Sequence, residues 1–321
     1  MQEQQLQELR REKWRVSGKP IRTIEEARAF IDSVGFCLLY PQRPPVMVPT
    51  FVGAYAGSDE NLPTWQMAYA DPNATEAKHL MVRLLRERAA YEANVFPENN
   101  FLLSASVFPF FYGLMGDRNP RQAPRATTRS GYSPLAAHAF EAIQKHGAIP
   151  KHRLRELLGG ELSEAALDRA LDELWGKLRI TRVDYNPDEG IYWDVLFRWS
   201  SDAVKEGMHI SVSAALTALV SQYLECVVAA QQEEVENFFS QFIGRGRVRE
   251  AINALLAARE LSFVHVGGKV MLQVGSLPPA VAPAEGPAPE ATANKPLLRR
   301  GQPLVARRLR KPVPKPEGEQ R

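Results

Sequence analysis

The residues of this chain best suited to bind phosphate are three arginines in the stretch GRGRVRE (244–250). Arg245, Arg247 and Arg249 fall at the start of a predicted helix, where free backbone N–H groups also favour anions. Residues 244–259 hold four arginines against one glutamate, a net charge of +3. This pattern predicts contact with the phosphates of DNA, although an ordinary solvated helix start has the same composition.

Two further groups of basic residues are candidates for phosphate contacts. Arg83 and Arg86 share one face of a helix predicted over residues 74–93. Residues 276–321 hold ten of the 24 prolines and no aromatic residue, so we expect a disordered tail with a basic arm over 303–315. The charged members of the arm that we select are Arg307, Arg308, Arg310 and Lys311. A tail that only improves solubility is the alternative interpretation.

A second predicted helix, over residues 161–178, has the opposite charge. It carries five acidic residues against Arg169 and Lys177, a net charge of −3. Phosphates repel such a helix, so it is a poor candidate for binding in the major groove. A protein partner is the alternative ligand for this helix.

Other kinds of chemistry find little support in the sequence. The two cysteines, Cys37 and Cys226, exclude a disulfide scaffold and a zinc site built on several thiolates, and the six histidines lack metal-binding spacing. The acidic pair Asp184 and Asp188 and the acidic group at 233–236 fit a turn and a helix start better than a catalytic site. The phosphate-binding loop of nucleotide-binding proteins is also missing, so we expect neither a metal nor a cofactor. Trp193, on a predicted hairpin, is either a groove-binding wedge or a core residue.

The elements that must position these residues follow a repeated pattern. Helices predicted at 135–143, 153–158 and 164–178 precede two extended pieces, 179–185 and 191–197. About 78 residues later, helices at 216–228, 235–242 and 248–256 precede strands at 261–266 and 269–274, which Gly267 and Gly268 join. Three helices followed by a hairpin is the order of a winged helix, a fold that binds either DNA or protein.

The N-terminal third is less regular. A polar helix is expected at 4–16, and Thr23 with Glu26 predicts a capping box for a helix that ends at Gly35. The most apolar run, 101–114, is interrupted by Pro109. The fold class is therefore mainly α with small β-hairpins (α+β), as tandem winged helix-turn-helix domains. The predicted parts are an N-terminal helix (1–22), a first winged-helix-like domain (23–118), a linker (119–130), second and third winged-helix domains (131–205 and 206–275) and the tail (276–321).

Two stretches, VGFCLLYP (34–41) and LLSASVFPFFY (102–112), together with the two winged-helix units, resemble the AlkZ/YcaQ family of bacterial DNA glycosylases over residues 23–274. The resemblance implies excision of alkylated or crosslinked bases by cleavage of the N-glycosidic bond, without metal or cofactor. It also implies a Gln-Xaa-Gln or Gln-Xaa-Asp motif in the first stretch, which positions a water molecule.

At the position of that motif this chain has Leu38 and Tyr40, with Gln42 two residues further on as a weak substitute. Leu103 and Ser104 stand where the family has a histidine before Ala105. Leucine cannot orient water, so we expect the catalytic motif to be replaced, and the catalytic residues stay unknown.

Two hypotheses follow. The first is a protein that binds double-stranded DNA and acts in recognition or repair of alkylated or crosslinked damage; if it is an enzyme, it is a monofunctional DNA glycosylase. The second is a non-catalytic winged-helix scaffold for a protein partner. No apolar run approaches the length of a membrane span and no leader precedes the first helix, so we expect a cytoplasmic, nucleoid-associated protein without a membrane partner.

Overall fold

A capping box at Thr23 begins the helix that leads into the first sheet. The Thr23 side chain accepts a hydrogen bond from the backbone N–H of Glu26, and the Glu26 carboxylate accepts one from the backbone N–H of Thr23, as the sequence predicts. The helix, α2 (Ile24–Val34), ends at Gly35, whose φ of 77° favours glycine, and strand β1 (Phe36–Leu38) follows. The computed structural model describes residues 1–96, 99–127 and 131–275.

The first sheet contains three antiparallel strands in the order β1-β3-β2, where β2 is Ala90–Phe96 and β3 is Asn99–Ser104. The helix predicted over 74–93 is wrong beyond its middle, because α4 (Pro72–Arg86) stops where Arg88 adopts a φ of 55° and β2 begins. The sheet supplies the hydrogen-bond partners that override helix propensity here. Pro109 lies in the first turn of α5 (Phe108–Met115), a position that proline favours, so it begins a helix instead of breaking one.

The remaining elements before residue 118 are short. They are α1 (Glu3–Lys13), α3 (Phe51–Ala56) and η1 (Ala68–Ala70).

The middle of the chain follows the predicted order of three helices and a hairpin. The serines Ser133 and Ser163 each accept a backbone hydrogen bond that caps a helix. A short strand, β4, pairs with β6 to give a three-stranded sheet in the order β4-β6-β5. The elements are α6 (Pro134–His146), β4 (Ile149–Pro150), α7 (Lys151–Leu157), α8 (Glu164–Trp175), β5 (Ile180–Asn186), β6 (Gly190–Val195), α9 (Leu196–Trp199) and α10 (Ser201–His209).

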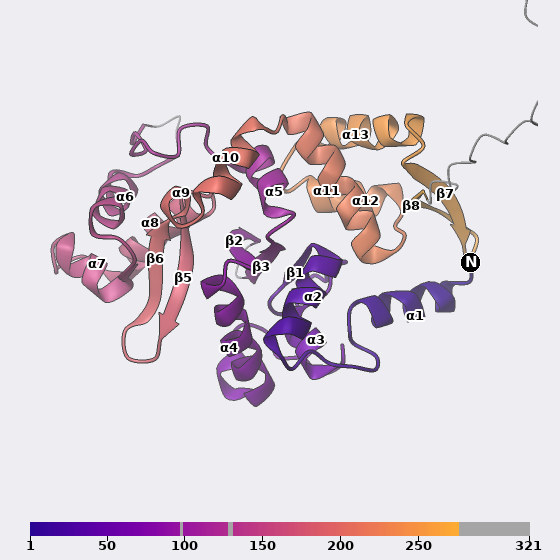
Figure 1. Cartoon of the computed structure of the whole chain (residues 1–321), viewed down its shortest axis with the longest axis horizontal. Coiled ribbons are helices and arrows are strands. Elements are labelled where there is room, and N and C mark those ends of the chain that lie inside the picture. The colour runs from indigo at the N-terminus through magenta and orange to yellow at the C-terminus, as the bar shows by residue number, and fades with distance from the viewer. Residues whose placement is uncertain (97–98, 128–130, 276–321) are drawn as a thin grey trace, which may run out of the picture. The chain divides into compact units, whose positions relative to one another are not determined.

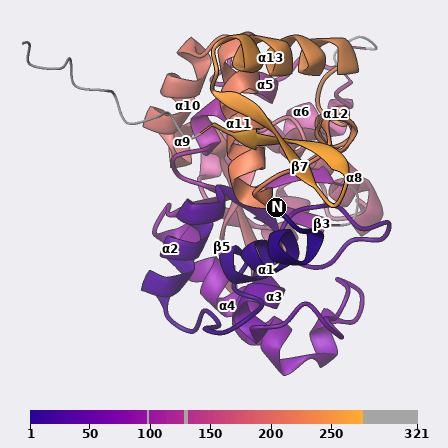
Figure 2. The same ribbon diagram turned by 90° about the vertical axis from the view of Figure 1, so that its right-hand side faces the viewer.

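The last part of the described chain repeats the order. Gly267 and Gly268 join the two final strands, and both have positive φ, as a two-residue hairpin turn requires. In Figure 2 this hairpin crosses in front of α11. The elements are α11 (Val212–Val227), α12 (Gln232–Phe239), α13 (Arg245–Ala257), β7 (Leu261–Val266) and β8 (Lys269–Val274).

An aromatic core joins the first sheet to the last three helices. The ring of Phe36 on β1 stacks on Phe238 of α12 at 5.7 Å, and Phe238 stacks on Tyr223 of α11 at 4.6 Å. Residues 23–118 and 206–275 therefore share one core, within a single compact unit of the described chain. The domain boundaries expected from the sequence stay predictions.

A second interface brings the middle segment against the first sheet, beside α4 (Figure 1). The indole N–H of Trp175 on α8 donates to the backbone oxygen of Glu92 on β2 at 3.0 Å. Arg86 on α4 pairs with Asp184 on β5, with 2.5 Å between Nε and Oδ1. These contacts enclose a cavity between the two parts.

Among the described residues, no single helix is long and apolar enough to cross a membrane. Helices α10 and α11 meet that criterion only as a pair, with a bend of 110° between them.

Arg179, which precedes β5, holds the segment that connects α5 to α6. Its side chain is almost fully buried, pairs with Asp117 and donates to the backbone oxygens of Asn119 (3.1 Å) and Gln122. Its guanidinium also lies 4.6 Å from the ring centroid of Phe140. One buried cation thus satisfies several acceptors of an otherwise irregular segment.

We expect Arg179→Met to lower the free energy of unfolding by about 2–4 kcal/mol, because it removes the cation that pairs with Asp117 and donates to the backbone oxygens of Asn119 and Gln122. Urea unfolding measures the change, and Arg169→Met on the exposed face of α8 is the control. Equal stabilities of the Arg179 variant and the wild type would contradict the prediction.

Candidate functional site

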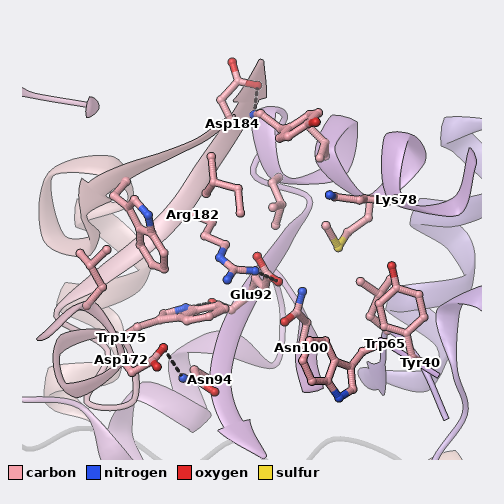
Figure 3. A pocket seen from close by; sticks show the side chains of 18 of the residues that line it. Tyr40, Trp65, Lys78, Glu92, Asn94, Asn100, Asp172, Trp175, Arg182 and Asp184 are labelled. Atoms are coloured by element: carbon pink, nitrogen blue, oxygen red, sulfur yellow. Dashed lines mark hydrogen bonds and ion pairs between the residues drawn. The ribbon is translucent and has the colours of Figure 1, made fainter. Parts of the chain in front are cut away.

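A cavity of about 590 Å³ lies between the first sheet and the middle segment (Figure 3). Its volume falls in the range of roughly 300–1,000 Å³ typical of small-molecule sites. The lining side chains come from α4, β2, β3, α8, β5 and β6 and from the loops after β1 and α3. The residues that carry aromatic or polar groups are Tyr40, Trp65, Lys78, Glu92, Asn94, Asn100, Asp168, Asp172, Trp175, Arg182, Asp184, Tyr185 and Trp193.

Glu92 lies at the centre of this cavity (Figure 3). The pleat of β2 directs Tyr91 and Ala93 into the shared aromatic core, whereas Glu92 and its cross-strand neighbour Leu102 face the other side of the sheet. The Glu92 side chain is 0% exposed. Its Oε1 lies 3.3 Å from Nη1 of Arg182, and its Oε2 is buried without a hydrogen-bond partner among the described residues.

Burial raises the pKa of Glu92 above the ordinary value of a glutamate. The charges of Arg182 and Lys78 and the hydrogen bond from Arg182 act in the opposite direction. Burial therefore favours the protonated form of Glu92, whereas the charges of Arg182 and Lys78 favour the ionised form.

Arg182 lies between this carboxylate and a pair of indole rings. Its guanidinium is 4.1 Å from the ring centroid of Trp175 and 5.2 Å from that of Trp193, its cross-strand partner. The two rings meet edge to face at 5.2 Å. A planar cation is thus bound by aromatic faces on one side and a carboxylate on the other.

The opposite side of the cavity is also aromatic. Tyr40, in the loop after β1, and Trp65, in the loop after α3, lie on the other side of Glu92 from Trp175 in Figure 3. Trp65 is 48% exposed, so its ring is at the mouth. Lys78 lies 4.6 Å from the ring centroid of Tyr185.

The other acidic residues of the cavity all have partners. Lys151 Nζ is 2.6 Å from Asp168, Asn94 donates to Asp172 at 3.0 Å, and Asp184 pairs with Arg86. Two of these acids belong to α8, so the acidic helix of the sequence forms a wall of the cavity. Glu92 differs from them in its complete burial and its unpartnered oxygen.

The residues at and near the position of the glycosylase motif lie in different environments. Leu38 is buried in the core within β1, whereas Tyr40 lines the cavity and is 8% exposed. Burial raises the pKa of Tyr40, and the charge of Glu92 raises it further. Gln42 is not among the lining residues, and its Oε1 is buried without a hydrogen-bond partner in the described part of the chain.

The three arginines predicted to bind phosphate lie at the N-terminus of α13, as expected. Arg249 forms a two-point ion pair with Glu236, at 2.9 Å for each contact, and this lowers the pKa of Glu236. Arg245 donates to the side-chain oxygen of Asn237 at 2.5 Å, and Arg247 is exposed.

The other basic candidates also include one ion-paired residue and one exposed residue. Arg86 is occupied by Asp184 and by the backbone oxygen of Tyr185, at 3.2 Å, so it fastens β5 to α4. Arg83 is exposed on α4. Arg307, Arg308, Arg310 and Lys311 lie outside the described residues.

Sequence reasoning missed Glu92, Arg182 and Asn100. The available signal was a single acid between apolar residues in AYEANVF (90–96), which alternates as a strand does. The extension of the preceding helix to residue 93 concealed this pattern. The structure buries Trp193, at 4% exposure, so the core interpretation of that residue is confirmed.

Comparisons with known proteins give a family match and a similar fold. A family model described as "DNA glycosylase AlkZ-like" matches residues 73–316, a range that includes Glu92 and omits the stretch 34–41. The solved structure of the Streptomyces sahachiroi DNA glycosylase AlkZ is similar in fold, with a TM-score of 0.55 and 13% identity over 85% of this chain and 70% of that one. No curated protein matches the sequence.

We expect Glu92→Gln to raise the free energy of unfolding at neutral pH. Because the pKa of Glu92 is raised in the folded state, the wild type loses stability as the pH rises from the ordinary glutamate pKa to the raised one. The stability that Glu92→Gln gains over the wild type is zero below this pH range. Above the range it is constant, at about 1.4 kcal/mol for each pH unit by which the pKa of Glu92 is raised.

Urea unfolding at acid and at neutral pH measures this gain. A variant less stable than the wild type at both values would show that the pair with Arg182 is a net stabilising contact, and would contradict the prediction.

Proposed function

Because the chain belongs to the AlkZ-like DNA glycosylase family, we propose that it binds duplex DNA and takes a damaged base out of the duplex into the cavity around Glu92. Proteins that act on a base inside a duplex must extrude it into a pocket that stacks its faces and binds its edge. The observation that carries this proposal is one cavity with indole rings on two sides and amide, cationic and carboxylate groups between them.

The chemistry of the cavity favours an alkylated base. Alkylation of a ring nitrogen of a purine nucleotide leaves the planar base with a positive charge. The lining carries four carboxylates against two cations, and indole faces attract planar cations. Arg182, itself a planar cation, occupies such a place between Trp175 and Glu92.

The contacts to the DNA backbone are proposed to come from the basic end of α13 and from the tail. Arg245 and Arg247 present two cations beside free N–H groups of the helix N-terminus. A phosphate must compete with Glu236 for Arg249. The two repeated segments would act as winged helices, with α13 at the DNA and the acidic α8 at the base pocket.

The family motif in residues 34–41 is proposed to be replaced. Leu38 packs in the core and offers no polar group, while Tyr40 reaches the cavity with a phenol. A scaffold for protein partners has less support, because the acidic residues Asp168 and Asp172 of α8 face the cavity.

We expect the full chain to bind a duplex with one 7-methylguanine more tightly than the unmodified duplex. A 2′-fluoroarabinose at that nucleotide prevents loss of the base, so binding is measured apart from chemistry. Trp65→Ala is expected to weaken binding of the modified duplex by about 1–3 kcal/mol through lost stacking.

Tyr69→Ala is the matched control for this test, because Tyr69 in η1, four residues after Trp65, is 87% exposed and is not among the lining residues. Fluorescence anisotropy gives the affinities. Equal binding of the two duplexes by the wild type would overturn the proposal and favour the scaffold hypothesis.

We expect log affinity for duplex DNA to fall linearly with log salt concentration, and the slope to flatten when Arg245, Arg247 and Arg249 are all changed to Gln. Each phosphate contact contributes about 0.9 to the slope. The control changes three ion-paired arginines, Arg11, Arg28 and Arg153, to Gln and so removes the same charge elsewhere.

A second variant changes Arg307, Arg308, Arg310 and Lys311 to Gln in the full chain. It measures how much the tail contributes to the slope of log affinity against log salt concentration. If the α13 variant and its control have the same slope, α13 does not contact phosphate.

A further inference from the structure

Glu92 has the features of a group that reacts instead of one that supports the fold. Its side chain is completely buried, yet one carboxylate oxygen has no hydrogen-bond partner among the described residues. An ionised carboxylate in such a place is costly unless something else requires it. Each of the other acids in the cavity has a partner and contact with solvent.

The neighbours of Glu92 fix the direction of this oxygen. Arg182 occupies Oε1, and the Trp175 indole binds the backbone oxygen of the same residue. The strand β2 is anchored on β3, so the side chain cannot move with a loop. Oε2 is therefore the acceptor left for a water molecule or a substrate in the cavity.

We propose that Glu92 is the catalytic carboxylate that cleaves the N-glycosidic bond of an alkylated nucleotide, an inference that rests on the proposed binding of such a base in this cavity. The carboxylate stabilises positive charge on the sugar and accepts the proton of the attacking water. It supplies the acceptor that Leu38 and Tyr40 do not offer at the motif position.

The step is balanced without another reactant. The bond between C1′ and the base nitrogen breaks, and its electron pair goes to the base, where it neutralises the charge that alkylation introduced. The oxygen of water bonds to C1′ of the resulting oxocarbenium ion. The water proton goes to Glu92 and then to solvent, and the products are a neutral free base, an abasic sugar and a proton.

The surroundings of Glu92 set the basicity of its carboxylate. Burial raises the pKa of Glu92, which makes the ionised form a stronger base. The groups that face it are Arg182 from β5, Lys78 from α4, Asn100 from β3 and Tyr40 from the loop after β1. Arg182 and Lys78 limit the rise by favouring the carboxylate.

The test is single-turnover release of 7-methylguanine from an alkylated duplex by the full chain in excess. Glu92→Gln is expected to reduce the rate by about 10² or more, because it removes the base and keeps the shape. Glu141→Gln makes the same charge change at an exposed residue of α6 outside the cavity, and is expected to remain within a few-fold of the wild type.

Two further measurements separate catalysis from structure. The wild-type rate should rise with pH through the raised pKa of Glu92 and then level, and Lys78→Met should move the midpoint to higher pH, because Lys78 lowers that pKa. Melting temperatures show whether the variants fold. Glu92→Asp, which keeps the carboxylate, should retain more activity than Glu92→Gln.

Each outcome has one meaning. Full activity of Glu92→Gln, or a wild type that binds the fluorinated duplex but releases no base from the alkylated one, overturns the role of Glu92 and leaves the proposed binding intact. A wild type that neither prefers the fluorinated duplex nor releases a base overturns the proposed function itself.

Discussion

The alternation of side chains along β2 is the constraint on which the site depends. Tyr91 and Ala93 must face the shared core, so Glu92 must face the opposite side of the sheet. The middle segment then covers that side through the bond between Trp175 and the backbone of Glu92. A carboxylate that would be solvated on an isolated sheet is thereby enclosed, and Arg182 pairs with it.

The charges of the two repeated segments suit different tasks. In the middle segment, Asp168 and Asp172 of α8 line the cavity, where they contact Lys151 and Asn94. In the last segment, α13 presents arginines at its N-terminus, and one of them is restrained by Glu236. The same order of helices and hairpin thus supplies a wall of the cavity in one segment and an arginine-rich helix start in the other.

The sequence predicted the elements well where a local signal exists. The capping box at Thr23, the serine caps of α6 and α8 and the Gly267-Gly268 turn each act within a few residues. The cavity was not predictable, because Glu92 and Arg182 meet only when a strand near residue 90 packs against another near 180. The pairing of Arg249 with Glu236 could not be predicted either, because the sequence of a helix start gives its charge but not the residues that pack against it.

The core that residues 23–118 share with residues 206–275 also determines when the first sheet can finish folding during synthesis. Phe36 leaves the ribosome early, but its stacking partner Phe238 belongs to the last part of the fold to be made. Domains that complete their own cores can fold in turn as the chain grows, whereas this sheet keeps one apolar face uncovered until α11 and α12 arrive. The apolar face of the first sheet therefore stays without its packing partners until residues 212–239 have been made.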